Sequence, residues 1–407
     1  MKSLNLPTAL KVDIVLPSSK SLCNRLLIIA ALSRQKMNLH NLSDCDDTRV
    51  LMRALSERSD VIDVMAAGTA MRFATAFFAS TEGGHVITGT ARMRQRPISV
   101  LVDALRQLGA DIAYVENEGF PPLRIKGKKL VGGELVLPAN VSSQYISALL
   151  MIAPTLERGL RLHLQGEIIS RPYIDMTLQL MANCGAQVEW EDATTIFIAP
   201  QPYEPPSDYC VESDWSAASY WYEFVALSSD KDARVVLPHL FQNSLQGDSR
   251  LSDYFLNLGV QTTFTEEGVV LTKGEEVDCG EMLHLDLSRQ PDLAQTLVVT
   301  CAMLKKPFHF TGLQTLKIKE TDRITALRTE LLKMGISVGE ANDSELFCET
   351  YDNKVCANSV VEVATYDDHR MAMAFAPCAY FFPNLRILHP EVVSKSYPAF
   401  WEDVAKI

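Results

Sequence analysis

The apolar and polar positions of the chain repeat one pattern, an amphipathic helix followed by a glycine and a short alternating strand. Four segments show this pattern: VDALRQLGADIAYV, TLQLMANCGAQVEW, SDYFLNLGVQTTF and RTELLKMGISVG. Their glycines (Gly109, Gly185, Gly259 and Gly335) are 76, 74 and 76 residues apart. Glycine fits the position after a helix because it adopts the left-handed conformation found there. The alternation that follows predicts a half-buried strand. We interpret MRALSERSDVIDV as a degenerate copy without the glycine.

A period of about 75 residues indicates a module of about two helices and several strands. The 407 residues would hold between five and six such modules, and pairing them predicts two similar α/β lobes. The stretch PQPYEPPSDYC (200–210) is typical of a linker or exposed loop. We place the other point where the chain passes between the lobes near LPSSKS, so that the N-terminal strand joins the C-terminal lobe. The expected lobes are residues 1–18 with 213–407, and residues 19–212.

The composition excludes several classes of protein. With 47 % apolar and 22 % charged residues, the chain is not mainly disordered. Its net charge of −12 argues against broad binding of nucleic acid or anionic membranes. No stretch approaches the roughly 20 apolar residues of a membrane span, and the N-terminus lacks the apolar region of a secretory signal. The nine scattered cysteines, without a CxxC pair, indicate reduced thiols in a cytoplasmic protein.

Basic residues collect at the predicted starts of helices. A helix N-terminus carries unpaired N–H groups and the positive end of the dipole, so it favours acids. Seven cations nevertheless lie there: Lys20, Arg25, Arg96, Lys319, Arg323, Arg370 and Lys395. In RMRQRPISVLVDALRQLG we expect Pro97 to be the first helical residue, with Arg96 before it. A ligand with several negative charges, such as phosphates and carboxylates, would relieve the repulsion.

Each of these residues also has an ordinary interpretation. A single basic residue near a helix start is more often a solvated surface charge. Taken alone, Ser142 fits an N-cap, Gly68 fits backbone packing and Asp292 fits a capping carboxylate. Only the whole set favours an anion site. The chain lacks P-loop, GxGxxG, HExxH and GxSxG motifs, which leaves metal-free chemistry on anions.

Seven stretches resemble the EPSP synthase (3-phosphoshikimate 1-carboxyvinyltransferase) family, in order from about residue 16 to 400. They are LPSSKSLCNRLLIIAAL, AAGTAMRF, RMRQRPISVLVDALRQLGA, VSSQYISALLM, SRPYIDMTLQLM, IKETDRITALRTELLKMG and YDDHRMAMA. The resemblance implies two lobes of three βαβαββ units each, an inverse α/β barrel with helix N-termini facing the cleft between the lobes. It also implies transfer of the enolpyruvyl group of phosphoenolpyruvate to the 5-hydroxyl of shikimate 3-phosphate, a step toward chorismate and the aromatic amino acids. No cofactor, obligatory metal or partner protein is implied, and the chain would be a monomer.

The resemblance also assigns roles to individual residues. Asp292 is expected to be the base toward the hydroxyl and Glu320 the acid toward carbon, with Lys20 assisting. Shikimate 3-phosphate would be held by Lys20, Ser21, Arg25, Ser142, Ser143, Gln144, Ser170, Asp292 and Lys319. Phosphoenolpyruvate would be held by Lys20, Gly68, Arg96, Gln144, Arg323, Arg370 and Lys395.

The chain departs from the family pattern at four positions. Ser18 and Phe73 replace the usual glycine and proline, and Ala66 and Thr315 replace asparagines. The departures bear on substrate affinity and on sensitivity to the herbicide glyphosate.

Three other interpretations remain open. In the related UDP-N-acetylglucosamine enolpyruvyl transferases an asparagine follows the first lysine and a mobile loop usually carries a cysteine. Here Ser21 follows Lys20, and TGTARMRQRP has no cysteine. A catalytically silent anion-binding paralogue would not need Asp292, Glu320, Lys20 and Arg323 together. A structural helical-repeat protein would give no reason for seven cations at helix starts.

Overall fold

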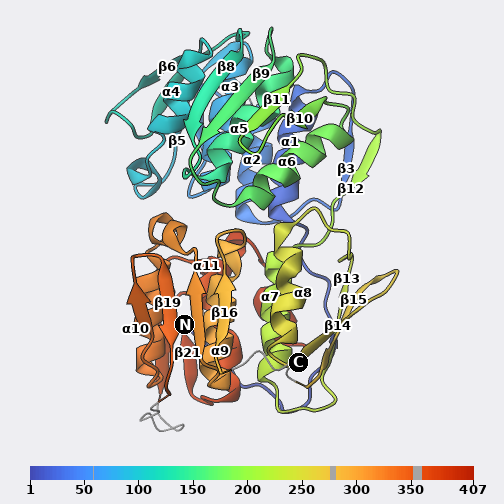
Figure 1. Ribbon diagram of the computed structural model, residues 1–407, viewed down its shortest axis with the longest axis vertical. Coiled ribbons are helices and arrows are strands. Elements are labelled where there is room, and N and C mark those ends of the chain that lie inside the picture. Colours follow the sequence, from blue (N-terminus) through green and yellow to red (C-terminus); the bar gives the residue numbers. More distant parts are fainter. Residues whose placement is uncertain (58, 276–280, 352–359) are drawn as a thin grey trace. The chain divides into compact units, whose positions relative to one another are not determined.

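The computed structural model describes residues 1–57, 59–275, 281–351 and 360–407, which form two compact units (Figure 1). Unit 1 comprises Met1–Pro17 and Glu212–Ile407, and unit 2 comprises Ser18–Val211. The division expected from the sequence places each boundary one residue later. Among the described residues, no helix has the length and apolarity needed to span a membrane.

Four four-stranded sheets in the described chain share one topology. In each, the first two strands in space are parallel, and the two that follow are antiparallel to their neighbours. The two sheets of unit 2 are β4 (Val61–Asp63), β5 (Gly83–Thr88), β7 (Leu123–Gly127), β6 (Asp111–Tyr114), and β8 (Gly133–Pro138), β9 (Leu160–Gln165), β11 (Thr195–Ile198), β10 (Val188–Trp190). The two sheets of unit 1 are β2 (Lys11–Asp13), β13 (Arg234–Pro238), β15 (Gly268–Lys273), β14 (Val260–Phe264), and β16 (Leu283–Asp286), β17 (Phe308–Thr311), β19 (Glu345–Cys348), β18 (Gly339–Ala341).

Two helices accompany each of these sheets, which gives the βαβαββ order that the family resemblance implies. One helix precedes the second strand: α3 (Gly68–Ser80), α5 (Ser143–Ile152), α7 (Trp215–Leu227) and α9 (Ala294–Leu304). Another follows it: α4 (Ser99–Gln107), α6 (Arg171–Asn183), α8 (Leu251–Leu256) and α10 (Arg323–Lys333). The four predicted glycines follow these second helices with φ between 76° and 102°, so the prediction of left-handed helix ends is confirmed.

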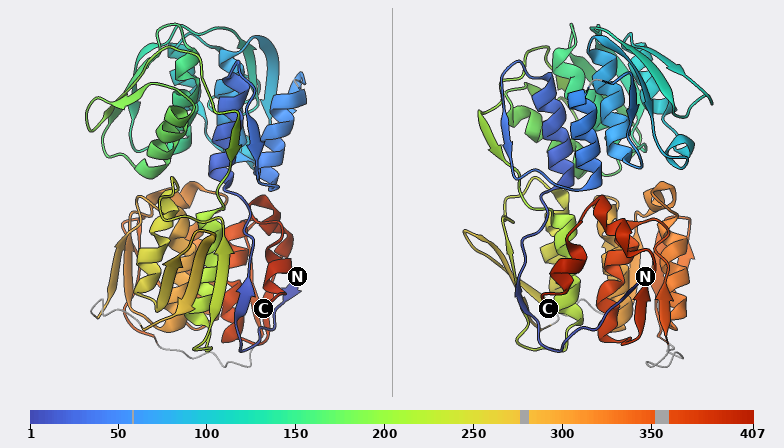
Figure 2. Two further views of the ribbon diagram at one scale, coloured as in Figure 1. Left: turned by 90° about the vertical axis from the view of Figure 1, so that its right-hand side faces the viewer. Right: turned by 180° about the vertical axis from the view of Figure 1, so that it is seen from behind.

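Two smaller sheets contain strands from distant parts of the chain. In unit 1, β21 (Leu385–Ile387) pairs in parallel with β20 (Val361–Val363) and antiparallel with β1 (Lys2–Ser3). In unit 2, β12 (Asp208–Cys210) lies parallel to β3 (Asn38–His40). Because β1 and β2 both pair with strands of unit 1, the N-terminal segment belongs to that unit, and Figure 2 shows it in dark blue against the unit.

Three largely buried helices pack together in each unit. In unit 2, α3 and α5 pack on each other and on α1 (Lys20–Leu32), and in unit 1, α7 and α9 pack with α11 (His369–Ala374). These helices are buried on nearly every side, as their almost uninterrupted apolar sequences require. The polar residues that remain can then reach solvent chiefly at helix ends.

The remaining elements are short or peripheral. They are α2 (Asp46–Glu57), α12 (Phe400–Val404) and the 3₁₀ turns η1 (Met93–Gln95), η2 (Ala153–Thr155), η3 (Gly247–Arg250), η4 (Pro291–Leu293), η5 (Gln314–Ile318), η6 (Ala376–Tyr380) and η7 (Pro390–Lys395). The interpretation of MRALSERSDVIDV as a degenerate copy of the repeat is wrong, because its strand has a different position in the sheet. After α2 the chain enters β4, which is the first strand of the next sheet, whereas the strands after the four glycines are the third in sequence.

One predicted helix start also needs correction. Helix α4 begins at Ser99 rather than at Pro97. Arg96 is extended, with φ −89° and ψ 122°, because a residue before proline avoids the helical region. Helix α6 begins at Arg171, so its proline is the second helical residue, and Ser170 before it is left-handed, with φ 57°.

Candidate active site

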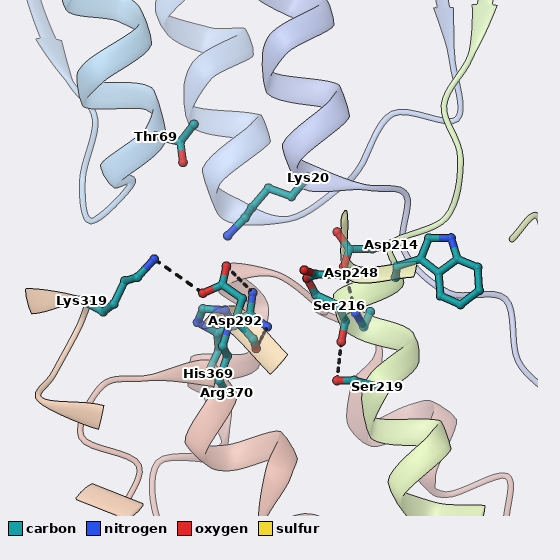
Figure 3. A network of polar contacts seen from close by, with 12 residues as sticks. Lys20, Thr69, Asp214, Ser216, Ser219, Asp248, Asp292, Lys319, His369 and Arg370 are labelled. Carbon is teal, nitrogen blue, oxygen red and sulfur yellow. Dashed lines mark hydrogen bonds and ion pairs between the residues drawn. The ribbon is translucent and has the colours of Figure 1, made fainter. Parts of the chain in front are cut away.

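Three cations of unit 1 surround Asp292, and two of them, Lys319 and Arg370, are labelled in Figure 3. Asp292 lies in η4, directly before α9. Its Oδ1 lies 3.2 Å from Nη1 of Arg323 and 3.6 Å from Nζ of Lys319. Its Oδ2 lies 3.1 Å from Nη2 of Arg370, which also donates a hydrogen bond to the Asp292 carbonyl. Three segments that are distant in sequence therefore meet at one carboxylate.

The network extends from Arg323 to two further carboxylates. Arg323 is the first residue of α10 and is only 2 % exposed. Its Nε lies 2.7 Å from Oδ2 of Asp368, and its Nη2 donates to Glu320 at 2.9 Å. The other oxygen of Glu320 accepts from Nζ of Lys395 at 2.6 Å. All six site residues that the sequence analysis placed in this part of the chain are thus joined by direct contacts.

Asp368 is the member of the network that the sequence analysis did not assign to the site. It is fully buried and caps α11 by accepting a hydrogen bond from the backbone N–H of Arg370. The signal was present in YDDHR, where an acid precedes a helix start, but the sequence could not distinguish a cap from a partner for Arg323. The structure shows both roles in one side chain.

The electrostatics of the network follow from four cations facing three carboxylates. Burial alone would raise the pKa of Asp292, but Arg370, Lys319 and Arg323 outweigh it and hold that pKa far below its ordinary value. Burial lowers the pKa of Lys319 despite the neighbouring Asp292. Burial also acts to lower the pKa of Arg323, but its three carboxylates raise it. Asp292 is therefore ionised and tightly held.

A second buried acid lies near this network. Asp248, in η3, accepts a hydrogen bond from the hydroxyl of Ser216 in α7 (Figure 3). Burial raises the pKa of Asp248 to about 6, with a contribution from the charge of Asp292 and an opposing one from Ser216. Two acids in one unit are thus shifted in opposite directions, which is typical of sites that transfer protons.

In unit 2, Arg25 is buried and has only uncharged partners among the described residues. Its guanidinium donates to Thr177 Oγ1, Ser147 Oγ and the carbonyls of Ser21 and Tyr173, at 2.7 to 3.3 Å. It also lies 5.5 Å from the ring centre of Phe73, the residue that replaces the family's proline. Burial lowers the pKa of Arg25 to about 10. The backbone N–H of Tyr173 donates to the carbonyl of Ser170, which connects that predicted residue to the same cluster.

The start of α3 gathers a second set of predicted residues in unit 2. Gly68 is the first residue of the helix, and a Cβ there would lie 2.7 Å from Nη1 of Arg96, so a larger residue would require this guanidinium to move. Gln144 donates to Thr69 at 3.1 Å. Arg72, which the sequence analysis did not assign, donates to the carbonyl of Gly68 and lies over the ring of Tyr145.

The remaining predicted residues lie at the starts of α1 and α5. Ser142 caps α5 by accepting from the backbone N–H of Gln144, and Ser143 is the first helical residue. Lys20 is the first residue of α1, and its ammonium lies 3.3 Å from Asp47. Asp47 was also not assigned from the sequence, because acids in the first turn of a helix are common. No three His, Cys, Asp or Glu residues in the described parts of the chain are grouped so that they could hold a metal ion.

Comparisons with known proteins cover the chain from end to end. The family EPSP synthase (3-phosphoshikimate 1-carboxyvinyltransferase) matches residues 4–59 and 51–404. The chain is 56 % identical over 403 residues to a 3-phosphoshikimate 1-carboxyvinyltransferase of Bacteroides fragilis, covering 99 % of this chain and 97 % of that protein. It is 36 % identical to one from Erwinia tasmaniensis, covering 100 % and 98 %.

A solved structure shows the same fold at lower sequence identity. The EPSP synthase of Acinetobacter baumannii superposes with a TM-score of 0.78 at 20 % identity, covering 99 % of this chain and 97 % of that one. The expected inverse α/β architecture is therefore confirmed. By the full-length match to the family and the identity to its curated relatives, this chain belongs to the EPSP synthase (3-phosphoshikimate 1-carboxyvinyltransferase) family.

Proposed function

We propose that the chain transfers the enolpyruvyl group of phosphoenolpyruvate to the 5-hydroxyl of shikimate 3-phosphate and releases phosphate, in the biosynthesis of chorismate and the aromatic amino acids. Membership of the family supports this reaction. The structural observation that carries the proposal is the network around Asp292, which combines carboxylates with four cations. Such a set can bind anions and exchange protons without a metal.

The reaction proceeds by addition and then elimination. A proton is added to the methylene carbon of phosphoenolpyruvate, and the 5-hydroxyl oxygen bonds to the neighbouring carbon as it loses its own proton. The tetrahedral adduct then loses phosphate, and the new methyl group returns a proton to the protein. We assign Asp292 as the acceptor of the hydroxyl proton and Glu320 as the donor to carbon, with Lys20 assisting both transfers.

The low pKa of Asp292 makes it a weak base while its three cations are unopposed by substrate. Arg323 and Arg370, which we assign to phosphoenolpyruvate, are the nearest of these cations. When the phosphate and carboxylate of phosphoenolpyruvate lie against these guanidinium groups, the electric field of the arginines at Asp292 weakens. The pKa of Asp292 therefore rises. Binding of phosphoenolpyruvate thus makes Asp292 a stronger base, so the proton is removed only when both substrates are bound.

We assign the other predicted residues to the two substrates as the family pattern indicates. Shikimate 3-phosphate is assigned Lys20, Ser21, Arg25, Ser142, Ser143, Gln144, Ser170, Asp292 and Lys319. Phosphoenolpyruvate is assigned Lys20, Gly68, Arg96, Gln144, Arg323, Arg370 and Lys395. Arg25 supports this assignment because its described partners are all uncharged, which leaves its positive charge available to an anionic substrate.

We further propose that units 1 and 2 are the two lobes of a monomeric, cytoplasmic enzyme. The seven described cysteines are free thiols, as expected for a reducing compartment. Cys279 and Cys356 lie outside the described residues. Size-exclusion chromatography with light scattering tests the monomer, since a mass near twice 45.2 kDa would contradict it.

One experiment decides between the proposed reaction and its nearest alternative. Phosphate release is measured with phosphoenolpyruvate and either shikimate 3-phosphate or UDP-N-acetylglucosamine. We expect release only with shikimate 3-phosphate. Release with the nucleotide sugar would assign the chain to the other enolpyruvyl transfer, and release with neither would indicate a silent anion-binding protein.

A further inference from the structure

Asp47 contacts the predicted catalytic lysine from a different helix. Its Oδ2 lies 3.3 Å from Nζ of Lys20, and both residues belong to unit 2. The Asp47 side chain is only 5 % exposed and that of Lys20 is 19 % exposed. The pair is therefore largely shielded from water, where the geometry of an ion pair matters more than at an open surface.

The surroundings of Asp47 fix the backbone that carries its carboxylate. Asp47 lies in the first turn of α2, where the helix dipole stabilises a negative charge. The turn that starts α2 is closed by hydrogen bonds from the N–H groups of Thr48 and Arg49 to the carbonyl of Cys45. The N–H of Ser43 donates to the sulfur of Cys23, which ties the preceding loop to α1. A short, fixed aspartate thus faces a long, flexible lysine.

The position of Lys20 explains why it needs such a partner. Lys20 is the first residue of α1, and the first turn of that helix contains no acid. The N-terminal dipole therefore opposes the ammonium charge and favours a lysine side chain that turns away into solvent. Asp47 supplies the opposing attraction from a neighbouring helix, since α1 and α2 pack together.

We propose that Asp47 is a positioning residue that keeps the Lys20 ammonium aimed for enolpyruvyl transfer. The proposal rests on the proposed role of Lys20. Loss of the Asp47 charge would let Lys20 adopt other rotamers and would misplace a group that acts in both proton transfers. The same loss removes a negative charge from a site for anions, so it is not expected to weaken substrate binding. The signature is therefore a fall in kcat without a rise in KM.

The test compares Asp47→Asn with Asp46→Asn, a neighbouring exposed acid in the same first turn of α2. Both variants lose one charge from the same helix end. We expect Asp47→Asn to lower kcat about 10- to 100-fold, as misplacement of a reacting group by about 1 Å does. Its KM for phosphoenolpyruvate should be unchanged or lower, and Asp46→Asn should retain the wild-type kcat.

A second readout follows Lys20 itself and needs no catalytic activity. Brief treatment with sulfo-N-hydroxysuccinimide acetate, followed by peptide mass spectrometry, gives the acetylation rate of Lys20 relative to that of exposed Lys36. We expect Asp47→Asn to raise this ratio several-fold, because an amine that Asp47 no longer holds in place is more accessible to the reagent. Asp46→Asn should leave the ratio unchanged. Asp47→Glu keeps the charge and should give values between those of wild type and Asp47→Asn in both readouts.

The outcomes separate this proposal from the proposed function. An unchanged acetylation ratio in a folded Asp47→Asn variant overturns the positioning role, whatever happens to kcat. A rise in KM with normal kcat also overturns it. If the wild type releases no phosphate from phosphoenolpyruvate and shikimate 3-phosphate, the proposed function fails. The acetylation ratio still reports whether Asp47 positions Lys20. Circular dichroism establishes whether each variant is folded. If Asp47→Asn does not fold, Asp47→Glu is compared with the wild type in kcat and in the acetylation ratio instead.

Discussion

Replacing Asp292 by asparagine removes one charge from the centre of the unit 1 network and keeps the shape of the side chain. The three cations within 3.6 Å then lose their shared carboxylate. An amide cannot accept the proton of the 5-hydroxyl, so we expect kcat to fall about 10²- to 10⁴-fold. Michaelis constants should change far less, because the variant site is more positive toward two anionic substrates.

The same substitution has a calculable effect on stability. Removing one partner of a buried ion pair costs about 3–5 kcal/mol, since the other charges stay buried without compensation. For a unit of this size each kcal/mol lowers the melting temperature by about 2–4 °C, so the unfolding of unit 1 should shift down by about 6–20 °C. Asp253→Asn is the matched control, because its ion pair with Arg250 is more than 60 % exposed on both sides and should contribute less than about 1 kcal/mol.

Inorganic phosphate provides the decisive comparison. If the cations require a counter-charge, phosphate should take the place of the missing carboxylate and raise the melting temperature of Asp292→Asn more than that of the wild type. The assays are steady-state phosphate release with phosphoenolpyruvate and shikimate 3-phosphate, and thermal unfolding with and without phosphate. Near-normal kcat would remove Asp292 as the proton acceptor. Equal stabilisation of both proteins by phosphate would refute the charge-compensation argument.

Three further predictions address other parts of the two units. Arg96→Ala should weaken binding of phosphoenolpyruvate much more than that of shikimate 3-phosphate in calorimetry, and equal losses would contradict its assignment. Arg25→Lys should raise the KM for shikimate 3-phosphate by about tenfold or more, because an ammonium cannot reproduce the hydrogen bonds of the guanidinium to Thr177 and Ser147. The raised pKa of Asp248, about 6 against an ordinary 3.8, favours the folded state below pH 4, and this contribution is lost as the pH rises toward 6. The loss is about 3 kcal/mol in the free energy of unfolding. Asp248→Asn should therefore flatten the plot of unfolding free energy against pH between pH 4 and 6, and an unchanged slope of this plot would refute the raised pKa of Asp248.

The repeat was predictable because each module must satisfy the same local requirements. The glycine after each second helix is needed for a left-handed backbone, and the four positive φ values show that the sequence pattern reflected this requirement directly. The two smaller sheets lack the pattern because their strands come from distant segments of the chain, such as β12 and β3. Pairing of this kind leaves no local periodicity.

The cations of the site were easier to predict than the carboxylates. A lysine or arginine at a helix start conflicts with the dipole and is conspicuous in a sequence, whereas an aspartate there is ordinary. Asp47 and Asp368 were therefore not assigned, although each contacts a predicted site cation directly. Only the three-dimensional structure distinguishes an acid that merely caps its own helix from one that also reaches a cation on another.

These carboxylates change the meaning of the cations. The sequence alone suggested that an external anion must neutralise them, yet Asp292, Glu320 and Asp368 already neutralise three of the four charges in unit 1. A phosphate and a carboxylate that bind to Arg323 and Arg370 must therefore compete with Asp292 for the same donors. This competition reduces affinity, but it also loosens the hold on Asp292 and raises its pKa only when substrate is present. A site with cations alone would bind phosphoenolpyruvate more tightly and would lack a base whose strength depends on the bound substrate. We therefore propose that the internal carboxylates convert part of the binding interaction into control of proton transfer.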